Sequence, residues 1–398
     1  MPENQTYSAG PQTGDIRSDC QVVYTKSANP IEIVVKTKLE VMYSKSIREL
    51  AAKSLDSLSI KTGKLEIIDF GAIPFVMMAH IETAIKRAFP SLKTALLPDV
   101  KSHTLYTSTR DKFRRSRLYL PGNQPKLWLN AGIHKPDGVI LDLEDSVPPN
   151  EKDSARHLVR NALRVLDFFG AERMVRINQG DMGFTDLDAI IPHNVNLVLV
   201  PKVESATYLK KVDAHIQSIQ NKYGLTQSVY LMPILESARG ILKALEIAEA
   251  STNTVALAIG LEDYTADLGV PRTNEGDESF FARSVVIHAA RATGIQAIDT
   301  VFSDVNDETG LRESVLEAKA LGFDGKGCIH PRQIRVVHDA FAPTQDEIDK
   351  ALRIVEAAKM AESKGLGVVS LGSKMIDPPV VKRALHTINM AKATGQLK

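Results

Sequence analysis

The chain has 398 residues, more than one average domain needs, so we expect two folded units. Lys and Arg number 49 against 48 Asp and Glu, which argues against nucleic acid or an anionic membrane as a partner. Cys20 and Cys328 are too few for a disulfide framework or a zinc site, and the most apolar stretches are too short to span a bilayer. We therefore expect a cytoplasmic protein.

The beginning of the chain predicts a small domain behind a polar terminus. Residues 1–18 are rich in polar residues and lack the apolar core of a signal peptide, so we expect them to be flexible. Residues 19–95 predict an α+β domain. Its expected strands are Gln21–Tyr24, Glu32–Lys36 and Lys64–Asp69, and its expected helices are Val41–Leu58 and Phe75–Phe89. Residues 96–114 are expected to be a linker.

Short apolar strands alternate with helical segments from residue 115 to residue 343. The eight expected strands are Arg117–Leu120, Gly138–Leu143, Met174–Ile177, Leu197–Val200, Tyr230–Leu235, Val255–Ile259, Ala297–Phe302 and Gly325–Ile329. This alternation indicates a parallel sheet covered on both faces. An open doubly wound sheet is the alternative, but the count of strands and the lack of a G-x-G-x-x-G turn after the first one favour a closed (β/α)8 TIM barrel. Residues 344–398 are expected to form a C-terminal helical extension.

Polar or charged residues follow five successive strands, at the end where such barrels carry their active sites. They are Glu144 and Asp145, Arg176 and Asn178, Lys202, Glu236, and Asp263. One residue of this kind would be an ordinary loop residue, but five in register predict a site.

The residue types in this set suggest a metal and an anionic substrate. Carboxylates on neighbouring strands, Glu236 and Asp263, suit a hard divalent cation that keeps several waters, and the acids after the second strand could hold those waters. A structural network between these acids and nearby Arg and Lys is the alternative. Lys202 fits a Schiff base or a structural ion pair, and both remain open. Arg176 is suited to clamp a substrate carboxylate, because its planar guanidinium binds such a group through two hydrogen bonds.

Seven short motifs occur in one order along this region. They are Arg115–Gly122 (RSRLYLPG), Leu141–Val147 (LDLEDSV), Val175–Asn178 (VRIN), Pro201–Ser205 (PKVES), Leu235–Gly240 (LESARG), Gly260–Asp263 (GLED) and Gly322–Pro331 (GFDGKGCIHP). With these motifs the region resembles the family of the citrate lyase β-subunit, malyl-CoA lyase and citramalyl-CoA lyase, of the HpcH/HpaI aldolase type.

The resemblance implies roles for individual residues. The implied magnesium ligands are Glu236 and Asp263, the implied substrate contacts are Arg176, Arg115 and Lys202, and the implied catalytic groups are Arg176, Glu144 and Asp145. The segment Gly372–Pro379 (GSKMIDPP) resembles the one that carries a catalytic acid, here Asp377, into a neighbouring subunit's site. The resemblance therefore also implies a homotrimer or homohexamer.

The stretches Ile67–Pro74 and His80–Ala88 resemble the acyl carrier subunits of citrate lyase and malonate decarboxylase. Those carriers bear a phosphoribosyl-dephospho-CoA arm on a serine just before a Gly-Asp or Ser-Asp pair. In this chain Thr13 precedes a Gly-Asp pair, whereas Arg17 precedes the Ser-Asp pair that begins at Ser18. Thr13 and Ser18 are therefore the candidate attachment residues. Covalent loading and a structural or docking role both remain open for this domain.

The reaction implied by the resemblance is the magnesium-dependent cleavage of a 3-hydroxy-3-carboxy acyl thioester into an acetyl thioester and a 2-oxo acid. The acyl group would be citryl, citramalyl or malyl, carried on CoA or on a carrier, and an acyltransferase subunit is a further expected partner. An aldolase or hydrolase acting on free oxo acids with the same metal is one alternative. A non-catalytic assembly subunit is another. If the carrier-like domain is an appendage, a chain that starts near Lys112 should keep most activity on CoA thioesters.

Overall fold

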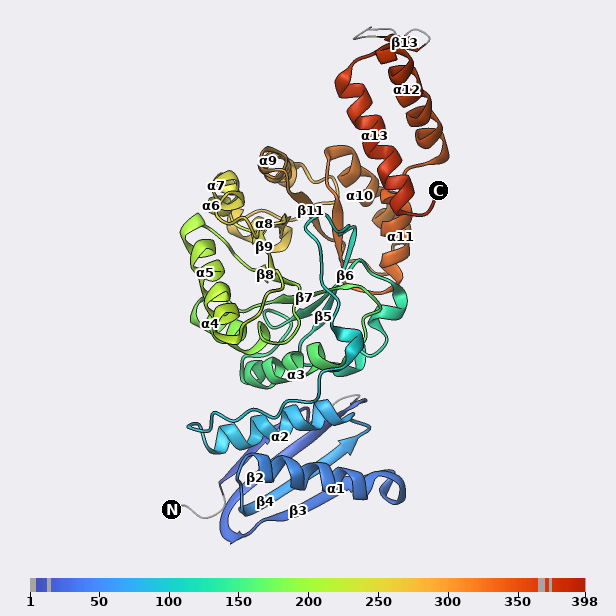
Figure 1. The fold of residues 1–398 in the computed structure, drawn as a ribbon. Helices are drawn as coiled ribbons and strands as arrows, with labels where there is room; N and C mark the ends of the chain where they lie inside the picture. Colours follow the sequence, from blue (N-terminus) through green and yellow to red (C-terminus); the bar gives the residue numbers. More distant parts are fainter. Residues whose placement is uncertain (1–4, 13–15, 364–368, 372–373, 398) are drawn as a thin grey trace.

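The computed structural model describes residues 5–12, 16–363, 369–371 and 374–397 (Figure 1). A small α+β domain lies at one end of the molecule, a closed barrel lies in the middle, and a helical hairpin projects from the other end. The expected fold class, a (β/α)8 barrel with an α+β domain before it and helices after it, is confirmed. Among the described residues, no helix is long and apolar enough to cross a membrane.

Among the described residues, the α+β domain contains a four-stranded sheet in the order β1-β2-β4-β3, in which the β3–β4 pair is parallel and the other pairs are antiparallel. Its elements are β1 (Thr6–Ala9), β2 (Asp19–Pro30), β3 (Glu32–Thr37), α1 (Glu40–Ser57), β4 (Thr62–Phe70) and α2 (Pro74–Ala88). Alternate residues of the central strands, Val22 and Tyr24 in β2 and Leu65 and Ile67 in β4, are buried in one cluster with apolar residues of both helices.

Strand β1 departs from the expectation that residues 1–18 are flexible. Residues Thr6–Ala9 form an edge strand whose register with β2 runs from Thr6 opposite Thr25 to Ala9 opposite Val22. This mostly polar stretch shows no hydrophobic alternation that would predict a strand. It pairs with β2 through backbone hydrogen bonds, which almost any sequence can make. The guanidinium of Arg87 in α2 also donates to the Ser8 carbonyl at 2.5 Å.

Eight parallel strands close the barrel in the order β5 to β12. They are β5 (Ser116–Pro121), β6 (Gly138–Asp142), β7 (Glu172–Arg176), β8 (Leu197–Val200), β9 (Tyr230–Leu235), β10 (Ala256–Ile259), β11 (Gln296–Val301) and β12 (Gly325–Cys328), which confirms the expected strands. Inward residues such as Ile140 and Met232 fill the centre, whereas their outward neighbours Val139 and Leu231 pack beneath the helices.

Helices cover the outside of the barrel (Figure 1). They are α3 (Lys152–Val165), α4 (Gly180–Ile190), α5 (Ala206–Tyr223), α6 (Ala238–Leu242), α7 (Ala244–Ala248), α8 (Leu261–Leu268), α9 (Asp277–Thr293), α10 (Glu308–Leu321) and α11 (Arg332–Phe341). The first connection, between β5 and β6, contains only the short 3₁₀ segments η2 (Pro125–Leu127) and η3 (Ala131–His134).

The connecting segment, residues 96–114, packs against the barrel. The Tyr106 hydroxyl donates to the Ala171 carbonyl at 2.6 Å, and the Arg173 guanidinium lies 3.9 Å from the centre of the Tyr106 ring. At its end, Arg114 and Glu172 form an ion pair that is fully buried. The segment is therefore part of the folded structure of the barrel.

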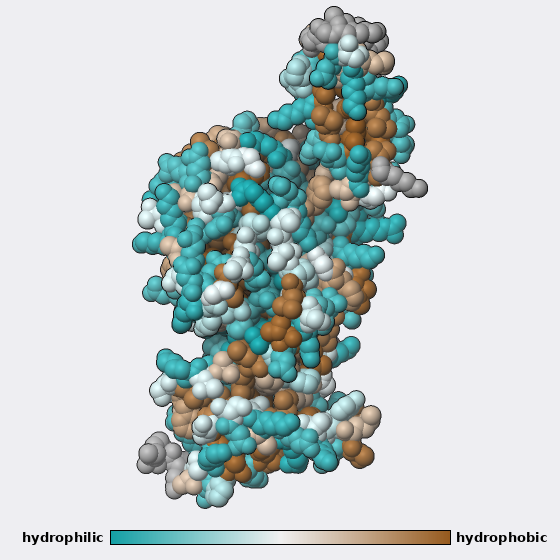
Figure 2. Space-filling model, viewed as in Figure 1, coloured by the Kyte–Doolittle hydropathy of each residue, from teal (hydrophilic) through white to brown (hydrophobic). Residues whose placement is uncertain are grey.

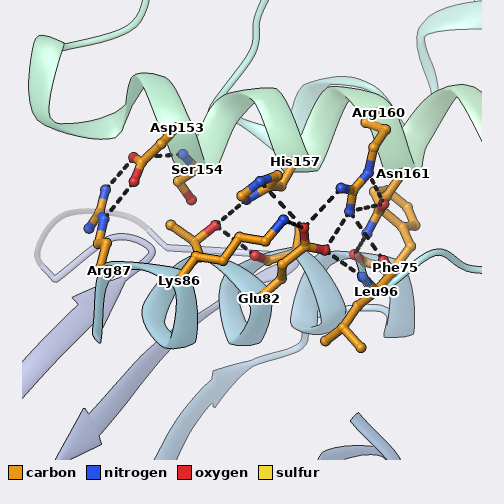
Figure 3. Close-up of polar contacts among 12 residues, drawn as sticks. Phe75, Glu82, Lys86, Arg87, Leu96, Asp153, Ser154, His157, Arg160 and Asn161 are labelled. Carbon is orange, nitrogen blue, oxygen red and sulfur yellow. Dashed lines mark hydrogen bonds and ion pairs between the residues drawn. The ribbon is translucent and has the colours of Figure 1, made fainter. Parts of the chain in front are cut away.

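Helix α2 of the α+β domain packs along α3 of the barrel, so the two domains share a buried interface (Figures 1 and 3). Phe75, Val76 and Ala79 of α2 belong to the same apolar cluster as Leu158 and Val159 of α3. Burial of this face removes apolar surface of both domains from water, which stabilises the interface.

Charged side chains of the two domains meet at the same interface around Glu82, whose side chain is fully buried (Figure 3). Arg160 of α3 donates to both Glu82 carboxylate oxygens, at 3.0 and 2.7 Å, and Lys86 donates to one of them at 2.7 Å. Burial raises the pKa of Glu82, but the hydrogen bond from Arg160 and the charges of His157, Arg160 and Lys86 outweigh it and lower the pKa to about 2. These contacts fix the α+β domain on the barrel.

The last part of the chain is a hairpin of α12 (Gln345–Ser363) and α13 (Pro378–Ala393), with the short strands β13 (Val369–Leu371) and β14 (Lys374–Ile376) between them. The two helices pack on each other through a small cluster that includes Ile354 and Ile388. Figure 2 shows hydrophobic side chains on this projecting hairpin, and Met360, Met375 and Leu385 are among its exposed residues.

Candidate active site

A cavity of about 490 Å³ lies at the carboxyl ends of the barrel strands. Its walls include Arg117, Tyr119, Asp142, Asp145, Arg176, Glu236, Gly260, Asp263 and Thr300. Five of the residues that the sequence predicts for the site, Asp145, Arg176, Glu236, Asp263 and the adjacent Glu144, are therefore brought together, as the expected strand ends require.

Arg176, the last residue of β7, is held by Asp142, the last residue of β6. Its Nε donates to Asp142 Oδ1 at 2.6 Å and its Nη2 donates to Asp142 Oδ2 at 2.8 Å. The third nitrogen, Nη1, lies 3.0 Å from Glu144 Oε2 and 3.7 Å from Asp145 Oδ2. Burial lowers the pKa of Arg176, but Asp142 outweighs it and the net shift is upward. The guanidinium thus stays charged and points only one nitrogen at the acids of the mouth.

Glu144 is buried next to this pair. Gln179 donates to its Oε1 at 2.7 Å, and its other oxygen faces Arg176. Burial raises the pKa of Glu144, although Arg176 and the hydrogen bond from Gln179 oppose the shift. Asp145 lies on the same loop with a half-exposed side chain, so it can reach solvent at the mouth.

Glu236 follows β9 and is 5% exposed. Its Oε1 accepts a hydrogen bond of 2.8 Å from the backbone N–H of Lys202. Burial and the neighbouring Glu144 and Asp263 raise the pKa of Glu236 to about 8, against the opposing effects of that hydrogen bond and Arg176. Gly260 leaves the carboxylate its space, because a Cβ at Gly260 would lie 2.5 Å from Glu236 Oε2.

Lys202 links the two acids that the sequence predicts as metal ligands. Its backbone has a positive φ of 48°, which turns its N–H toward Glu236, and its Nζ lies 3.0 Å from Asp263 Oδ1. Burial lowers the pKa of Lys202, but Asp263 outweighs it and the pKa is raised. The ion-pair interpretation of Lys202 is thus the one that this geometry supports.

The donor set fits a hard divalent cation. Glu236 and Asp263 line one cavity, and burial, with the neighbouring acids Glu144 and Asp263, raises the pKa of Glu236, so a bound cation would stabilise its charged form. In the part of the chain that the structure describes, no three His, Cys, Asp or Glu side chains gather closely enough to hold a metal by themselves. A cation here would take its remaining ligands from water and substrate oxygens, as Mg²⁺ does.

Arg115 lies at the opposite end of the barrel, immediately before β5. Its Nε and Nη2 each donate at 2.9 Å to the carboxylate of Asp137, which immediately precedes β6. The expected substrate contact of Arg115 does not agree with this position, and we do not propose it. Arg115 stands immediately before the first residue of β5, at the amino end of the strand. Its side chain therefore cannot reach the mouth, which lies at the carboxyl ends of the strands.

Three further candidates lie outside the cavity or outside the described residues. The Asp377 carboxylate accepts a hydrogen bond of 3.1 Å from the backbone N–H of Val380 and caps α13 on the projecting hairpin. Ser18 is half-buried, has a φ of 55° and donates its N–H to the Phe70 carbonyl at 3.1 Å. Thr13 lies outside the described residues.

The segment that contains Ser18 borders the same end of the barrel as the candidate site. Ile16, Arg17 and Asp19 share a cavity of about 230 Å³ with residues 123–126 and Glu151, which follow β5 and β6. Residue 121, at the end of β5, also lines the main cavity. The α+β domain therefore presents its candidate attachment segment close to the mouth of its own barrel.

Several residues of the site were missed by the sequence analysis. Asp142 lies inside a quoted motif, but its pairing with Arg176 depends on the register between β6 and β7. Arg117 and Tyr119 face inward from β5, alternating with the outward apolar residues Leu118 and Leu120. This alternation could have predicted that Arg117 and Tyr119 belong to the site, because polar residues are unusual in the inward positions of a buried parallel strand.

The closed barrel and the acid-rich mouth define a (β/α)8-barrel enzyme. Residues 115–331, more than half of the chain, match the family described as HpcH/HpaI aldolase/citrate lyase, and the chain belongs to this family. It is a carbon–carbon lyase by class. Residues 14–88 match the family described as malonate decarboxylase delta subunit, which agrees with the expected carrier-like domain.

Individual relatives agree with this assignment. The citrate lyase subunit beta of Haemophilus influenzae is 44% identical, over 71% of this chain and 98% of its own length. The mitochondrial citramalyl-CoA lyase of Homo sapiens is 31% identical, over 77% of this chain and 95% of its own. The solved structure of the CitE protein of Mycobacterium tuberculosis with magnesium, acetoacetate and coenzyme A is 32% identical, covers 71% of this chain and all of that chain, and has a TM-score of 0.60.

Proposed function

We propose that this chain is a magnesium-dependent lyase that cleaves a 3-hydroxy-3-carboxy acyl thioester into an acetyl thioester and a 2-oxo acid. The observation that carries the proposal is the pair Glu236 and Asp263 in one cavity with Arg176. The CitE protein of Mycobacterium tuberculosis, whose solved complexes contain magnesium with coenzyme A or with pyruvate, supports the same ligands for this chain.

The bond changes follow from the substrate. The 3-hydroxyl group would give its proton to a basic oxygen at the mouth, for which the carboxylates of Glu144 and Asp145 are available, and the bond between C2 and C3 breaks with its electron pair staying on C2. C3 becomes the carbonyl carbon of the 2-oxo acid, and C2 becomes the enolate carbon of the acetyl thioester, which must take up a proton. Bound magnesium would supply a Lewis acid for the oxygen on C3.

The residues of the chain would orient the substrate and offset charge. Glu236 and Asp263 would hold the metal, with Lys202 positioning both carboxylates through its N–H and its ammonium group. Arg176 Nη1 would stabilise the developing oxyanion, because Asp142 holds the guanidinium in one orientation. Glu144 and Asp145 would orient water at the metal.

The enolate carbon needs an acid, and we assign Asp377 of a neighbouring subunit to this step. Asp377 does not line the cavity of its own chain and stands on the projecting hairpin, which supports a homo-oligomer, a trimer or hexamer, as the active form. For the α+β domain we propose a docking role near the mouth, with Thr13 and Ser18 as the residues to examine for a phosphoribosyl-dephospho-CoA arm. An acyltransferase subunit would be the partner of a loaded domain.

A cleavage screen tests this function. The full chain is incubated with citryl-, citramalyl- and malyl-CoA and magnesium, and the released 2-oxo acid is measured. We expect release from at least one thioester, loss of release with a chelator, and loss in Glu236→Gln. No release from any thioester by folded, magnesium-loaded protein would exclude cleavage of CoA thioesters. The same screen with thioesters on a carrier would then decide whether the proposal survives.

A further inference from the structure

Arg117 is a buried cation at the floor of the candidate active site. It is 1% exposed, faces inward from β5 and lines the 490 Å³ cavity together with Tyr119 and Glu236. Its closest polar contacts are weak: Nη1 lies 3.1 Å from Met232 Sδ, and Nη2 lies 3.5 Å from the Asp299 carbonyl oxygen. Its Nε is buried and makes no hydrogen bond with any residue that the structure describes.

No acid of the barrel forms an ion pair with Arg117. Within the described part of the chain, Arg117 forms no ion pair, whereas the buried arginines Arg114, Arg160 and Arg283 each have a carboxylate partner. Arg173, which is also buried there, pairs with no carboxylate but donates to the backbone carbonyls of Asn194 and Tyr106 at 2.6 and 2.7 Å. Asp299 contacts Arg117 through its backbone carbonyl. Its carboxylate points to other cations, with Lys326 at 2.7 Å and Arg283 at 3.3 Å. Asp299 therefore offers Arg117 only its backbone carbonyl.

A buried guanidinium without an anionic partner is costly, because desolvation of the charge is not offset. Arg117 lines the cavity whose walls also include Glu236 and Arg176, so a ligand in the cavity can reach it. The small residues Ala258 and Gly327 form part of the cavity wall, and a Cβ at Gly327 would lie 2.6 Å from Val301 Cγ1. An anion in the cavity is therefore the group that can pair with Arg117.

We propose that Arg117 is a subsite for a second carboxylate of the substrate, so that this lyase prefers the citryl thioester. The inference rests on the proposed function. The three candidate substrates differ at C3, which bears a carboxymethyl group in the citryl thioester, a methyl group in the citramalyl thioester and a hydrogen atom in the malyl thioester. Only the first places an additional carboxylate in the cavity, and its 2-oxo acid product, oxaloacetate, retains that group.

The two carboxylates would then have different partners. The carboxylate beside the hydroxyl would bind at the mouth, near Arg176 and the metal ligands, and the carboxymethyl group would extend inward to Arg117. Arg117 lies two residues before Tyr119 on β5, so it is deeper in the barrel than the residues at the strand ends. A charge-assisted, bidentate contact at that depth would be shielded from water, which makes it selective.

Binding of the products tests the subsite without any turnover. Calorimetry with magnesium compares freshly dissolved oxaloacetate with pyruvate, in wild type, Arg117→Met and Arg117→Lys. We expect wild type to bind oxaloacetate roughly ten- to hundredfold more tightly than pyruvate. Arg117→Met should lose this preference and keep its affinity for pyruvate, whereas Arg117→Lys should keep part of the preference, because it retains the charge but not the planar fork.

The outcomes separate the subsite from the proposed reaction. An oxaloacetate preference that survives in folded Arg117→Met, or a wild type that shows no preference, would overturn the subsite. If Arg117→Met does not fold, an unchanged preference in Arg117→Lys together with an unchanged pyruvate affinity would also count against it. If the wild-type preference depends on Arg117 but no thioester is cleaved, the subsite stands and the proposed reaction fails.

Discussion

Asp142 fixes Arg176 through two short hydrogen bonds, of 2.6 and 2.8 Å, that join the ends of neighbouring strands β6 and β7. Ser146 adds a hydrogen bond of 2.5 Å from its hydroxyl to Asp142 Oδ2, and the backbone N–H of Glu144 donates to Oδ1 at 3.0 Å. Burial raises the pKa of Asp142, but Arg176 and these hydrogen bonds lower it overall. Asp142 thus directs the remaining nitrogen of Arg176, Nη1, toward Glu144 and the mouth of the cavity, although Asp142 itself need not touch substrate.

The first prediction is that Asp142→Asn lowers kcat/KM strongly, because Arg176 loses the ion pair that fixes its orientation and can turn further toward Glu144 and Asp145. We also expect a loss of roughly 3 kcal/mol of unfolding free energy, since one partner of a buried ion pair becomes neutral. Steady-state kinetics and urea unfolding measure the two effects. Ser146→Ala is the control, because it removes one hydrogen bond and leaves the ion pair. Equal activity of Asp142→Asn and wild type would show that the orientation of Arg176 does not matter.

The second prediction concerns metal binding by Glu236 and Asp263. Glu236→Gln and Asp263→Asn should each abolish magnesium binding in calorimetry and reduce activity to background. The melting temperature of Glu236→Gln without magnesium should not fall, because the raised pKa of Glu236 means that its buried charge is costly in the metal-free protein. Glu246→Gln, an exposed acid in α7, serves as the control. Tight magnesium binding by both site variants would refute this ligand set.

The third prediction is that Gly260→Ala disturbs the metal site by contact alone. Gly260 has φ −110° and ψ 100°, which alanine adopts without strain, but the new Cβ would lie 2.5 Å from Glu236 Oε2. We expect magnesium affinity to fall by about tenfold or more, with a loss of stability of about 1 kcal/mol. Calorimetry and thermal unfolding check both values. Unchanged magnesium affinity would mean that Glu236 does not bind the metal in the conformation described.

The barrel could be predicted from the sequence because each strand carries its own signal. An apolar run such as Leu197–Val200 between helical segments is visible without knowledge of its neighbours, and the strand ends then gather Glu236 and Asp263 automatically. Strand β1 carries no such signal, because its polar residues pair through the backbone at a sheet edge. The end of the barrel at which Arg115 lies could not be predicted without knowing that β5 begins directly after it, at Ser116.

Contacts between distant segments could not be predicted. The pairing of Glu82 with Arg160 joins helices of two domains, and nothing in either helix alone indicates the other. From the sequence we expected a chain that starts near Lys112 to keep most activity. The structure argues against this, because such a chain would expose the apolar face of α3 around Leu158 and leave buried Arg160 without its acid.

The fourth prediction is that Glu82 couples the two domains in a pH-dependent way. Glu82→Gln should cost roughly 3–5 kcal/mol at neutral pH, since Arg160 loses its buried partner. The folded pKa of Glu82, about 2, lies below the ordinary value of about 4.3 for the unfolded chain. Its stabilisation is therefore complete above about pH 4.3 and is lost as the pH falls toward 2.

Urea unfolding at pH 7, 5 and 3.5 measures the difference between Glu82→Gln and wild type. We expect a similar difference at pH 7 and 5 and a smaller one at pH 3.5. The control is Asp56→Asn, which breaks the exposed pair with Lys61 and should cost less than about 1 kcal/mol at every pH. A difference that grows as the pH falls would contradict the assigned pKa shift.

The last prediction is that Asp377 acts in the active site of another subunit. In its own chain Asp377 caps α13, directly after β14, and α13 belongs to the hairpin that projects from the barrel (Figure 1). Exposed Met360, Met375 and Leu385 give this hairpin apolar surface that a neighbouring subunit can cover. Asp377→Asn keeps the helix cap, because Asn caps as well as Asp, but removes the acid. It should lower kcat strongly with little change in stability or product binding.

Complementation then decides where the acid acts. Asp377→Asn and Glu236→Gln are mixed in equal amounts under conditions that allow subunit exchange. A site works only if its own barrel has Glu236 and the neighbouring hairpin has Asp377, so random mixing should restore about one quarter of wild-type activity in a cyclic homo-oligomer. Each variant incubated alone through the same exchange is the control. If exchange is demonstrated by mixed mass species and no activity returns, Asp377 belongs to the site of its own chain or to no site, because only an acid supplied between subunits can be rescued by a partner.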